Sequence, residues 1–118
     1  MRKHRGWGLW GLWVLSSVHA EGTGLPDPEI AEQALASAEA SVSQRLDPKS
    51  RAGLEASQSA WEVYRSAECE FRTQWTEGGS VRTQLIQLCR ARLAEERVEA
   101  LRYFLECEEG DLTCPPPP

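Results

Sequence analysis

Histidine is almost absent from this 118-residue sequence, and the two that occur, His4 and His19, both lie within the first 20 residues. A product cleaved after Ala20 would contain none, which excludes serine–histidine triads, imidazole general bases and histidine-containing zinc sites within one protomer. Lysine is also scarce, since Lys49 is the only one after residue 20. Because phosphate neutralisation needs Lys and Arg, we expect no nucleic-acid partner.

The apolar run at the N-terminus, Gly6–Ser17, is shorter than the roughly 20 residues that a membrane-spanning helix needs. It follows the basic residues Arg2, Lys3 and Arg5 and precedes Val18-His19-Ala20, which has the small-residue pattern of a cleavage site. These features predict a signal peptide over residues 1–20, followed by a flexible leader over residues 21–26. We expect an exported protein, periplasmic or extracellular, without stable membrane insertion after cleavage.

The product would have 98 residues, with 10 basic and 18 acidic side chains and a formal charge of −8. One small domain of this size often needs covalent stabilisation, and export favours disulfides between Cys69, Cys89, Cys107 and Cys114. Their spacings include no Cys-x-x-Cys pair, so we expect no zinc site and no other metal or cofactor. A catalytic thiol is also not expected, because no histidine could activate it.

Two Asp-Pro pairs, Asp27-Pro28 and Asp47-Pro48, predict helix starts. The first helix is expected over Pro28–Leu46 and the second over Pro48–Thr76. Each has an apolar stripe at helical spacing, which we interpret as core. The stripe of the first helix is Ala31, Leu35, Ala38, Val42 and Leu46; that of the second is Leu54, Trp61, Tyr64, Phe71 and Trp75.

Glu77-Gly78-Gly79-Ser80 interrupts the helical pattern, with glycines for a left-handed C-cap and Ser80 as the N-cap of a third helix over Ser80–Cys107. A Pro-rich tail, residues 110–118, follows the domain expected over residues 27–109 and should be solvated. The apolar stripe of the third helix is Leu85, Cys89, Leu93, Ala100 and Phe104.

Four cysteines allow three pairings, and sequence alone does not choose between them. If the second and third helices fold back at Gly79, Cys69 lies ten residues before the turn and Cys89 ten after it. A Cys69–Cys89 bridge would clamp this hairpin, and Cys107–Cys114 would form a C-terminal staple; a Cys69–Cys107 bridge would break the hairpin. The expected fold is all-α: a small antiparallel helical hairpin or three-helix bundle clamped by disulfides, with the first helix on the aromatic face.

Glu68 falls within the aromatic stripe, so it should lie at the seam between helices or be half-buried, where a carboxylate needs a partner. Arg65 and Arg90 are closer to it in level than Arg97 is. An ion pair that orients the helices and a functional contact are both open.

A set of spaced residues runs from Gln58 to Leu101: Trp61-x-x-Tyr64-Arg65-x-x-Glu68-Cys69, then Gly78-Gly79-Ser80, then Cys89, Arg97 and Leu101. This pattern resembles the N-terminal domain family of the LprI-type lysozyme inhibitors. The resemblance implies a small exported helical domain of a bacterial envelope that binds a protein. The family typically has further cysteines near the mature N-terminus, whereas this chain has none before Cys69 and carries two after the motif.

One hypothesis is therefore a binding protein that occludes a basic lysozyme, since opposite net charges accelerate encounter. The contact region would be the hairpin end, where an exposed loop can enter a cleft. Its residues are Trp75, Glu77, Gly78, Gly79 and Ser80. For Trp75 the alternative is a place in the core, and for Glu77 a solvated loop charge.

The alternative function is a structural or interaction module of the periplasm, which could form a homo-oligomer through the charged run Arg90–Glu99. That run could equally be a solvated helix face. An enzyme is not expected, because neighbouring carboxylates such as Glu68 and Glu70, or Glu95 and Glu96, point to different faces of a helix.

Overall fold

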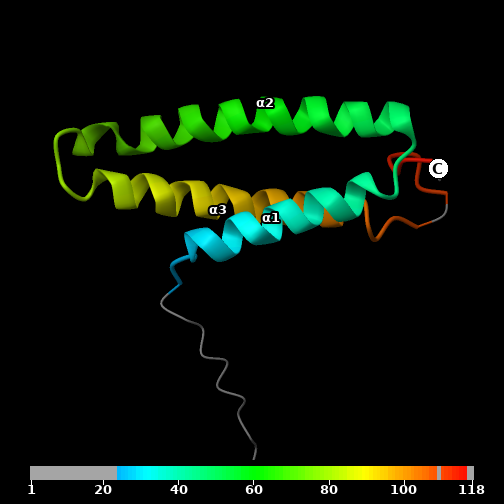
Figure 1. Ribbon diagram of the computed structural model, residues 1–118, viewed down its shortest axis with the longest axis horizontal. Helices are drawn as coiled ribbons and strands as arrows, with labels where there is room; N and C mark the ends of the chain where they lie inside the picture. Colours follow the sequence, from blue (N-terminus) through cyan, green and yellow to red (C-terminus); the bar gives the residue numbers. More distant parts are fainter. Residues whose placement is uncertain (1–23, 109, 117–118) are drawn as a thin grey trace, which may run out of the picture.

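The computed structural model describes residues 24–108 and 110–116, which form three α-helices and one 3₁₀ turn without any strand. The helices are α1 (Pro28–Ser43), α2 (Pro48–Thr73) and α3 (Arg82–Arg102), with the 3₁₀ turn η1 (Gln74–Thr76) after α2. The long helices α2 and α3 run antiparallel, and α1 lies along α3 (Figure 1). The predicted all-α hairpin is confirmed. The predicted signal peptide, and the leader up to residue 23, lie outside the described residues.

Both Asp-Pro signals start helices as predicted. The Asp27 carboxylate accepts hydrogen bonds from the backbone N–H groups of Glu29 (2.9 Å) and Ile30 (3.2 Å). The Asp47 carboxylate accepts one from the Ser50 N–H (2.8 Å), and this bond is the main reason why the pKa of Asp47 lies below its usual value. These bonds satisfy N–H groups that have no partner within the helix.

The other helix ends differ by a few residues from the prediction. Helix α1 ends at Ser43 because a tight turn follows it, although Leu46 is still buried. Gly78 has a positive φ (78°), which agrees with the expected left-handed glycine. Ser80 does not cap α3: it lies in the turn, and α3 begins at Arg82 without a side-chain cap. At its other end α3 stops at Arg102, short of Cys107.

The core lies mainly between α1 and α3, which corrects the expectation that α1 packs on the aromatic face of α2. Both helices present alanines to each other, and small side chains let helix axes approach closely. The stripe predicted for α1 is confirmed in full. Of the stripe predicted for α3, Leu93 is fully buried, whereas Ala100 is exposed. The buried cluster consists of Ala31, Leu35, Ala38, Val42, Leu46, Ala91, Ala94, Val98 and Leu101.

Helix α2 is rotated relative to the prediction. Its buried residues are Arg65, Cys69 and Thr73, at spacings of four, while Leu54 and Trp61 reach the core only in part. Tyr64, Phe71 and Trp75, interpreted from the sequence as core, are exposed. The polar and sulfur-bearing face of α2 therefore points inward, and most of its aromatic face points outward.

Both predicted disulfides are present, Cys69–Cys89 and Cys107–Cys114, with Cα–Cα distances of 5.7 and 5.8 Å. The tail is less solvated than expected, because Cys114 and Pro115 are half-buried. It returns to the corner between α1 and α2 (Figure 1), where it lines a cavity of about 360 Å³ with Leu46 and Leu54.

Replacing Cys69 and Cys89 together by alanine should lower the free energy of unfolding by about 3 kcal/mol, because the bridge restricts the unfolded chain across the hairpin. The Cys107/Cys114 double alanine variant, whose loop is shorter, should lose less. Urea unfolding of the oxidised proteins measures both values. A peptide map that joins Cys69 to Cys107 would contradict the fold itself.

Candidate functional site

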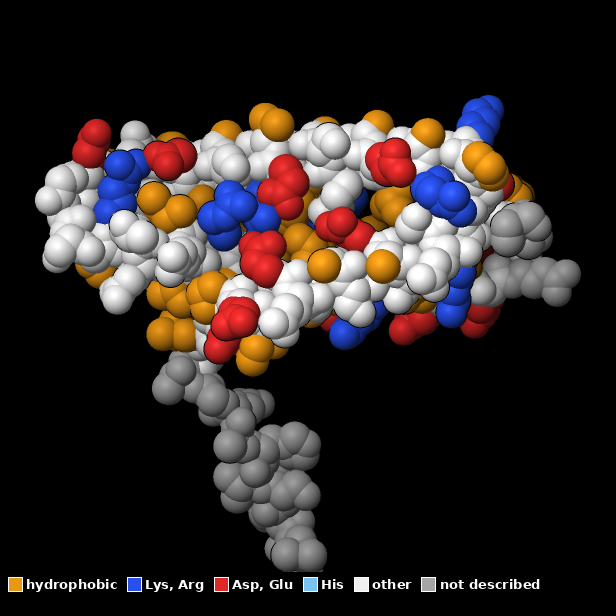
Figure 2. Space-filling view, in the orientation of Figure 1, with side chains coloured by type: hydrophobic (Ala, Val, Ile, Leu, Met, Phe, Trp, Pro, Cys, Tyr) orange, Lys and Arg blue, Asp and Glu red, His pale blue; other side chains and the backbone are white. Residues whose placement is uncertain are grey.

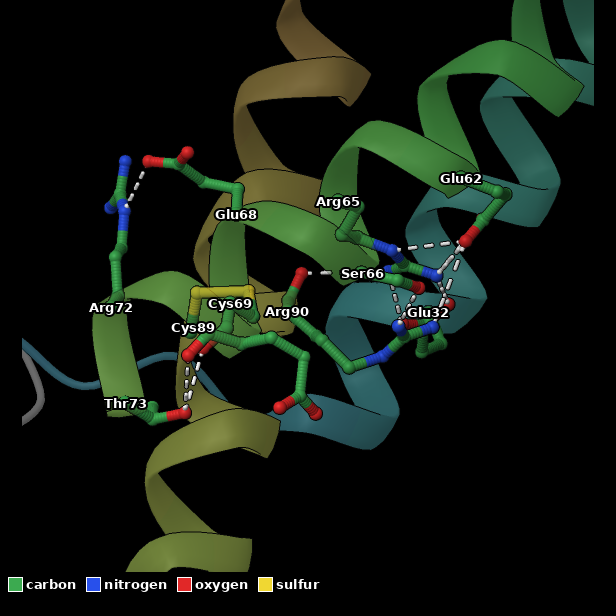
Figure 3. Close-up of a disulfide and its surroundings, with 11 residues drawn as sticks. Glu32, Glu62, Arg65, Ser66, Glu68, Cys69, Arg72, Thr73, Cys89 and Arg90 are labelled. Atoms are coloured by element: carbon green, nitrogen blue, oxygen red, sulfur yellow. Dashed lines mark hydrogen bonds and ion pairs between the residues drawn. A yellow bond between two sulfur atoms is a disulfide. The ribbon is translucent and has the colours of Figure 1, made fainter. Parts of the chain in front are cut away.

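Arg65 occupies the junction of the three helices and is 2% exposed. Its guanidinium donates to Glu32 of α1 (2.5 Å) and to Glu62 of α2 (2.8 Å), and reaches the backbone oxygen of Arg90 on α3 (3.5 Å). Figure 3 shows the three acidic and basic side chains converging beside the Cys69–Cys89 bridge. One cation thus connects all three helices.

The charge of Arg65 is retained despite its burial. Loss of water opposes the charged form, but the hydrogen bonds that Arg65 donates to Glu32 and Glu62 outweigh this effect and raise the pKa of Arg65. The guanidinium also stands over the Trp61 ring, 4.7 Å from its centroid. The motif residues Trp61 and Arg65 are therefore in contact, and the geometry gives them a structural role.

A second polar cluster also joins α1, α2 and α3. Arg97 donates to Gln58 (2.9 Å) and Ser57 (3.0 Å), and its guanidinium lies 5.9 Å from the Trp61 centroid. Gln58 in turn donates to the carboxylate of Glu39 on α1. Arg97 is thus a bridge between helices, while Leu101, the last motif residue, is fully buried core.

Between α1 and α2 lies a groove of about 550 Å³ with Glu39, Glu55 and Glu62 on its sides and Ala36, Ala40 and Leu54 among its other lining residues. Figure 2 shows acidic side chains along this hollow with hydrophobic ones between them. Burial, and then the charge of Glu62, raise the pKa of Glu39. Because Glu62 is paired with Arg65 and Arg90, the negative charge of the groove comes from Glu39 and Glu55.

Glu68 is half-buried, as one of the alternatives had it, but its partner is Arg72 (2.7 Å), one turn along α2. The pair lies within one helix, so it does not orient the helices. Arg65 and Arg90, the arginines closest in level, have other partners: Arg65 is held by Glu32 and Glu62, and Arg90 faces Ser66 and Glu62. Figure 3 shows the Glu68–Arg72 pair on the other side of the disulfide from the Arg65 cluster. This hydrogen bond raises the pKa of Arg72.

The charged run Arg90–Glu99 is not a uniform outer face. Ala91, Leu93, Ala94 and Val98 are buried within it, and Arg90 and Arg97 bond to α2. The solvated positions in this run are Arg92, Glu95, Glu96 and Glu99.

The hairpin end carries an exposed aromatic pair. Trp75 is 75% exposed and meets Phe71 edge to face, with ring centroids 5.6 Å apart. Glu77, Gly78, Gly79 and Ser80 follow it, all exposed. The sequence alternative that Trp75 belongs to the core is wrong, and Glu77 is a solvated loop charge beside an exposed indole.

Across residues 24–108 and 110–116, no cluster of acidic, cysteine or histidine side chains has an arrangement that could hold a metal ion. Nor is any helix within these residues both long and apolar enough to cross a membrane. Sequence reasoning missed three side chains in the polar contacts between helices: Glu32, Gln58 and Glu39. It also missed Glu62, although the spacing of three residues along a helix could have indicated its pairing with Arg65.

Comparison with models of protein families identifies the family of the chain. The family model described as "Lysozyme inhibitor LprI" matches residues 28–101. The chain belongs to the LprI family. No curated protein and no solved structure matches the chain significantly.

The LprI match begins at the first residue of α1 and ends one residue before the end of α3, so it includes the whole core. It extends the resemblance seen from Gln58 back by 30 residues, across Glu32 and Glu39. The Cys107–Cys114 staple lies beyond the matched segment.

Replacing both Glu32 and Glu62 by glutamine should destabilise the fold by about 3 kcal/mol, because the buried Arg65 cation would lose both compensating charges. Chemical denaturation measures the loss. Glu99→Gln, which removes half of an exposed ion pair with Arg102, is the matched control and should leave the unfolding midpoint within error. An equal effect of the two changes would show that Arg65 does not organise the fold.

Glu39→Gln should stabilise the protein at pH 7 by a few tenths of a kcal/mol. Folding raises the pKa of Glu39, so the protonated carboxyl contributes to stability at a pH below its unfolded-state pKa of about 4.3. This contribution is lost as the pH rises through the folded-state pKa. Glutamine stays neutral and avoids this loss. Thermal unfolding at about pH 3 and at pH 7 should show a difference between the proteins at pH 7 alone; an equal difference at both would contradict this.

Proposed function

We propose that this LprI-family protein is an exported inhibitor that binds a basic lysozyme and blocks its active-site cleft by occlusion. The observation that carries the proposal is the exposed Trp75 at the narrow end of the hairpin, beside Glu77. Family membership supports the class of partner and favours a binding protein over an enzyme. The signal-like N-terminus and the two disulfides support an oxidising location outside the cytoplasm.

The hairpin end has the features of a wedge. Trp75 offers a large aromatic surface whose orientation is limited by the contact with Phe71, so little side-chain freedom is lost on binding. The Cys69–Cys89 bridge lies two turns away and holds the two helices that carry the loop. Gly78, which uses a backbone conformation with positive φ, keeps the tip narrow.

Charge supports the encounter with a basic enzyme. Residues 21–118 have a formal charge of −8, and Glu39 and Glu55 add carboxylates to the groove between α1 and α2. Such a field speeds association with a positively charged partner and is screened by salt. Contact with the Trp75 indole at the tip would stabilise the complex, and the acidic charge spread over the molecule would speed its formation.

Trp75→Ala should weaken lysozyme inhibition at least about 30-fold, because an exposed tryptophan that anchors an interface contributes about 2 kcal/mol or more. The assay is lysis of a cell-wall suspension by a basic lysozyme in the presence of the oxidised chain from residue 21. Val63→Ala, which shortens another exposed side chain away from the loop, is the control and should inhibit like the unmodified protein.

Two results would end this proposal. One is the absence of inhibition at micromolar protein together with the absence of a complex at low salt. The other is full inhibition by the Trp75→Ala protein, which would move the contact away from the hairpin end.

A further inference from the structure

The outward side of α2 forms an aromatic seam that nothing in the described residues covers. Tyr64, Phe71 and Trp75 are 51%, 59% and 75% exposed. Together with Glu68 they recur at spacings of four, three and four residues. This alternation is the seam pattern of a helix that packs lengthwise along another helix. We call Tyr64, Glu68, Phe71 and Trp75, with the flanking Arg72, the α2 seam.

The α2 seam is close to neutral, although the molecule is strongly acidic. Its one acid, Glu68, is compensated by Arg72 at 2.7 Å. A basic partner would gain little electrostatic energy from such a surface, whereas the groove on the other side of α2 offers it Glu39 and Glu55. The seam is instead the part of α2 where a second copy, with the same negative charge, could approach without repulsion.

The order of residues along the seam makes it self-complementary. If two α2 helices lie antiparallel about a two-fold axis at residue 70, Glu68 of each copy lies opposite Arg72 of the other. The same axis brings Tyr64 to within one residue of Trp75, because the midpoint of that pair falls between residues 69 and 70. The centres of the charge pairs and the aromatic pairs thus nearly coincide, as a symmetric contact between identical surfaces requires.

We propose that the α2 seam is the interface of an antiparallel, two-fold symmetric homodimer. Phe71, next to the axis, packs at the centre, and the two Glu68–Arg72 pairs exchange partners across it. This inference goes beyond lysozyme inhibition and does not depend on it. Because Trp75 belongs to both contacts, the dimer and the lysozyme complex exclude one another. Six half-exposed rings of this size would bury several hundred Å² in all, which is at the low end for specific interfaces and indicates a reversible dimer.

Complementary charge variants test the pairing directly. Glu68→Arg places two arginines on each seam, and Arg72→Glu places two glutamates there, so each variant should self-associate at least about tenfold more weakly than the unmodified chain. An equimolar mixture of the two variants restores an acid opposite every arginine and should form a heterodimer as tight as the original homodimer. Sedimentation equilibrium of the oxidised chain from residue 21, over a range of concentrations, measures all four samples.

Two further variants separate the seam from the rest of α2. Tyr64→Lys changes an exposed ring of the seam and should weaken dimerisation at least about tenfold. Val63→Lys, at the adjacent exposed position but turned by about 100° around the helix, should leave it unchanged. Circular dichroism verifies that each variant is folded.

The lysozyme contact and the dimer contact are distinguishable. Association measured without lysozyme reports only the dimer, and it should persist at about 0.5 M salt, where a contact steered by charge is screened. A chain that stays monomeric at about 1 mM, a mixture of charge variants that does not associate, or an unaffected Tyr64→Lys protein would each overturn the proposal. Loss of lysozyme binding by the seam variants of a monomeric chain would assign the seam to the enzyme instead.

Discussion

The rest of the fold depends on the buried cation of Arg65. Its bonds to Glu32 of α1 and to the Arg90 carbonyl of α3 fix the rotation of α2 about its own axis. With that rotation set, the residue one turn later, Cys69, faces α3 and meets Cys89. The aromatic positions are then turned away from the core. A buried guanidinium, which needs charged partners from its neighbours, thus decides which surface α2 offers to other molecules.

Sequence reasoning succeeded where a local rule governs the outcome. The two Asp-Pro starts, the α1 stripe and the Cys69–Cys89 register about the Gly78-Gly79 turn all follow from spacing within one or two elements. It failed for the face of α2, because periodicity counts Trp75 and Phe71 as core and cannot weigh them against a buried arginine. It also failed for α1 packing on α3, which depends on the close fit of alanines from distant segments.

For the candidate site, the sequence predicted that Trp75 and Glu77 lie at the hairpin end, and the structure has them there. The sequence could not decide whether the Trp75 indole is exposed, because its exposure depends on the rotation of α2. The residues of the spaced motif have different roles in the structure. Arg65, Arg97 and Leu101 hold the helices together, while Tyr64 and Glu68 lie toward the outer side of α2. A spacing pattern does not by itself separate residues that support a fold from residues that face a partner.

Neither disulfide ties α1 to the hairpin, since one joins α2 to α3 and the other joins the C-terminal segment to itself. Yet α1 supplies four of the nine residues of the buried cluster, and Leu46, just after its end, is a fifth. If the oxidised protein opens partially, α1 can therefore separate as a unit while α2 and α3 stay linked. Amide protons of α1 would exchange with solvent before those around Cys69, and the alanine face of α3 would be transiently bare.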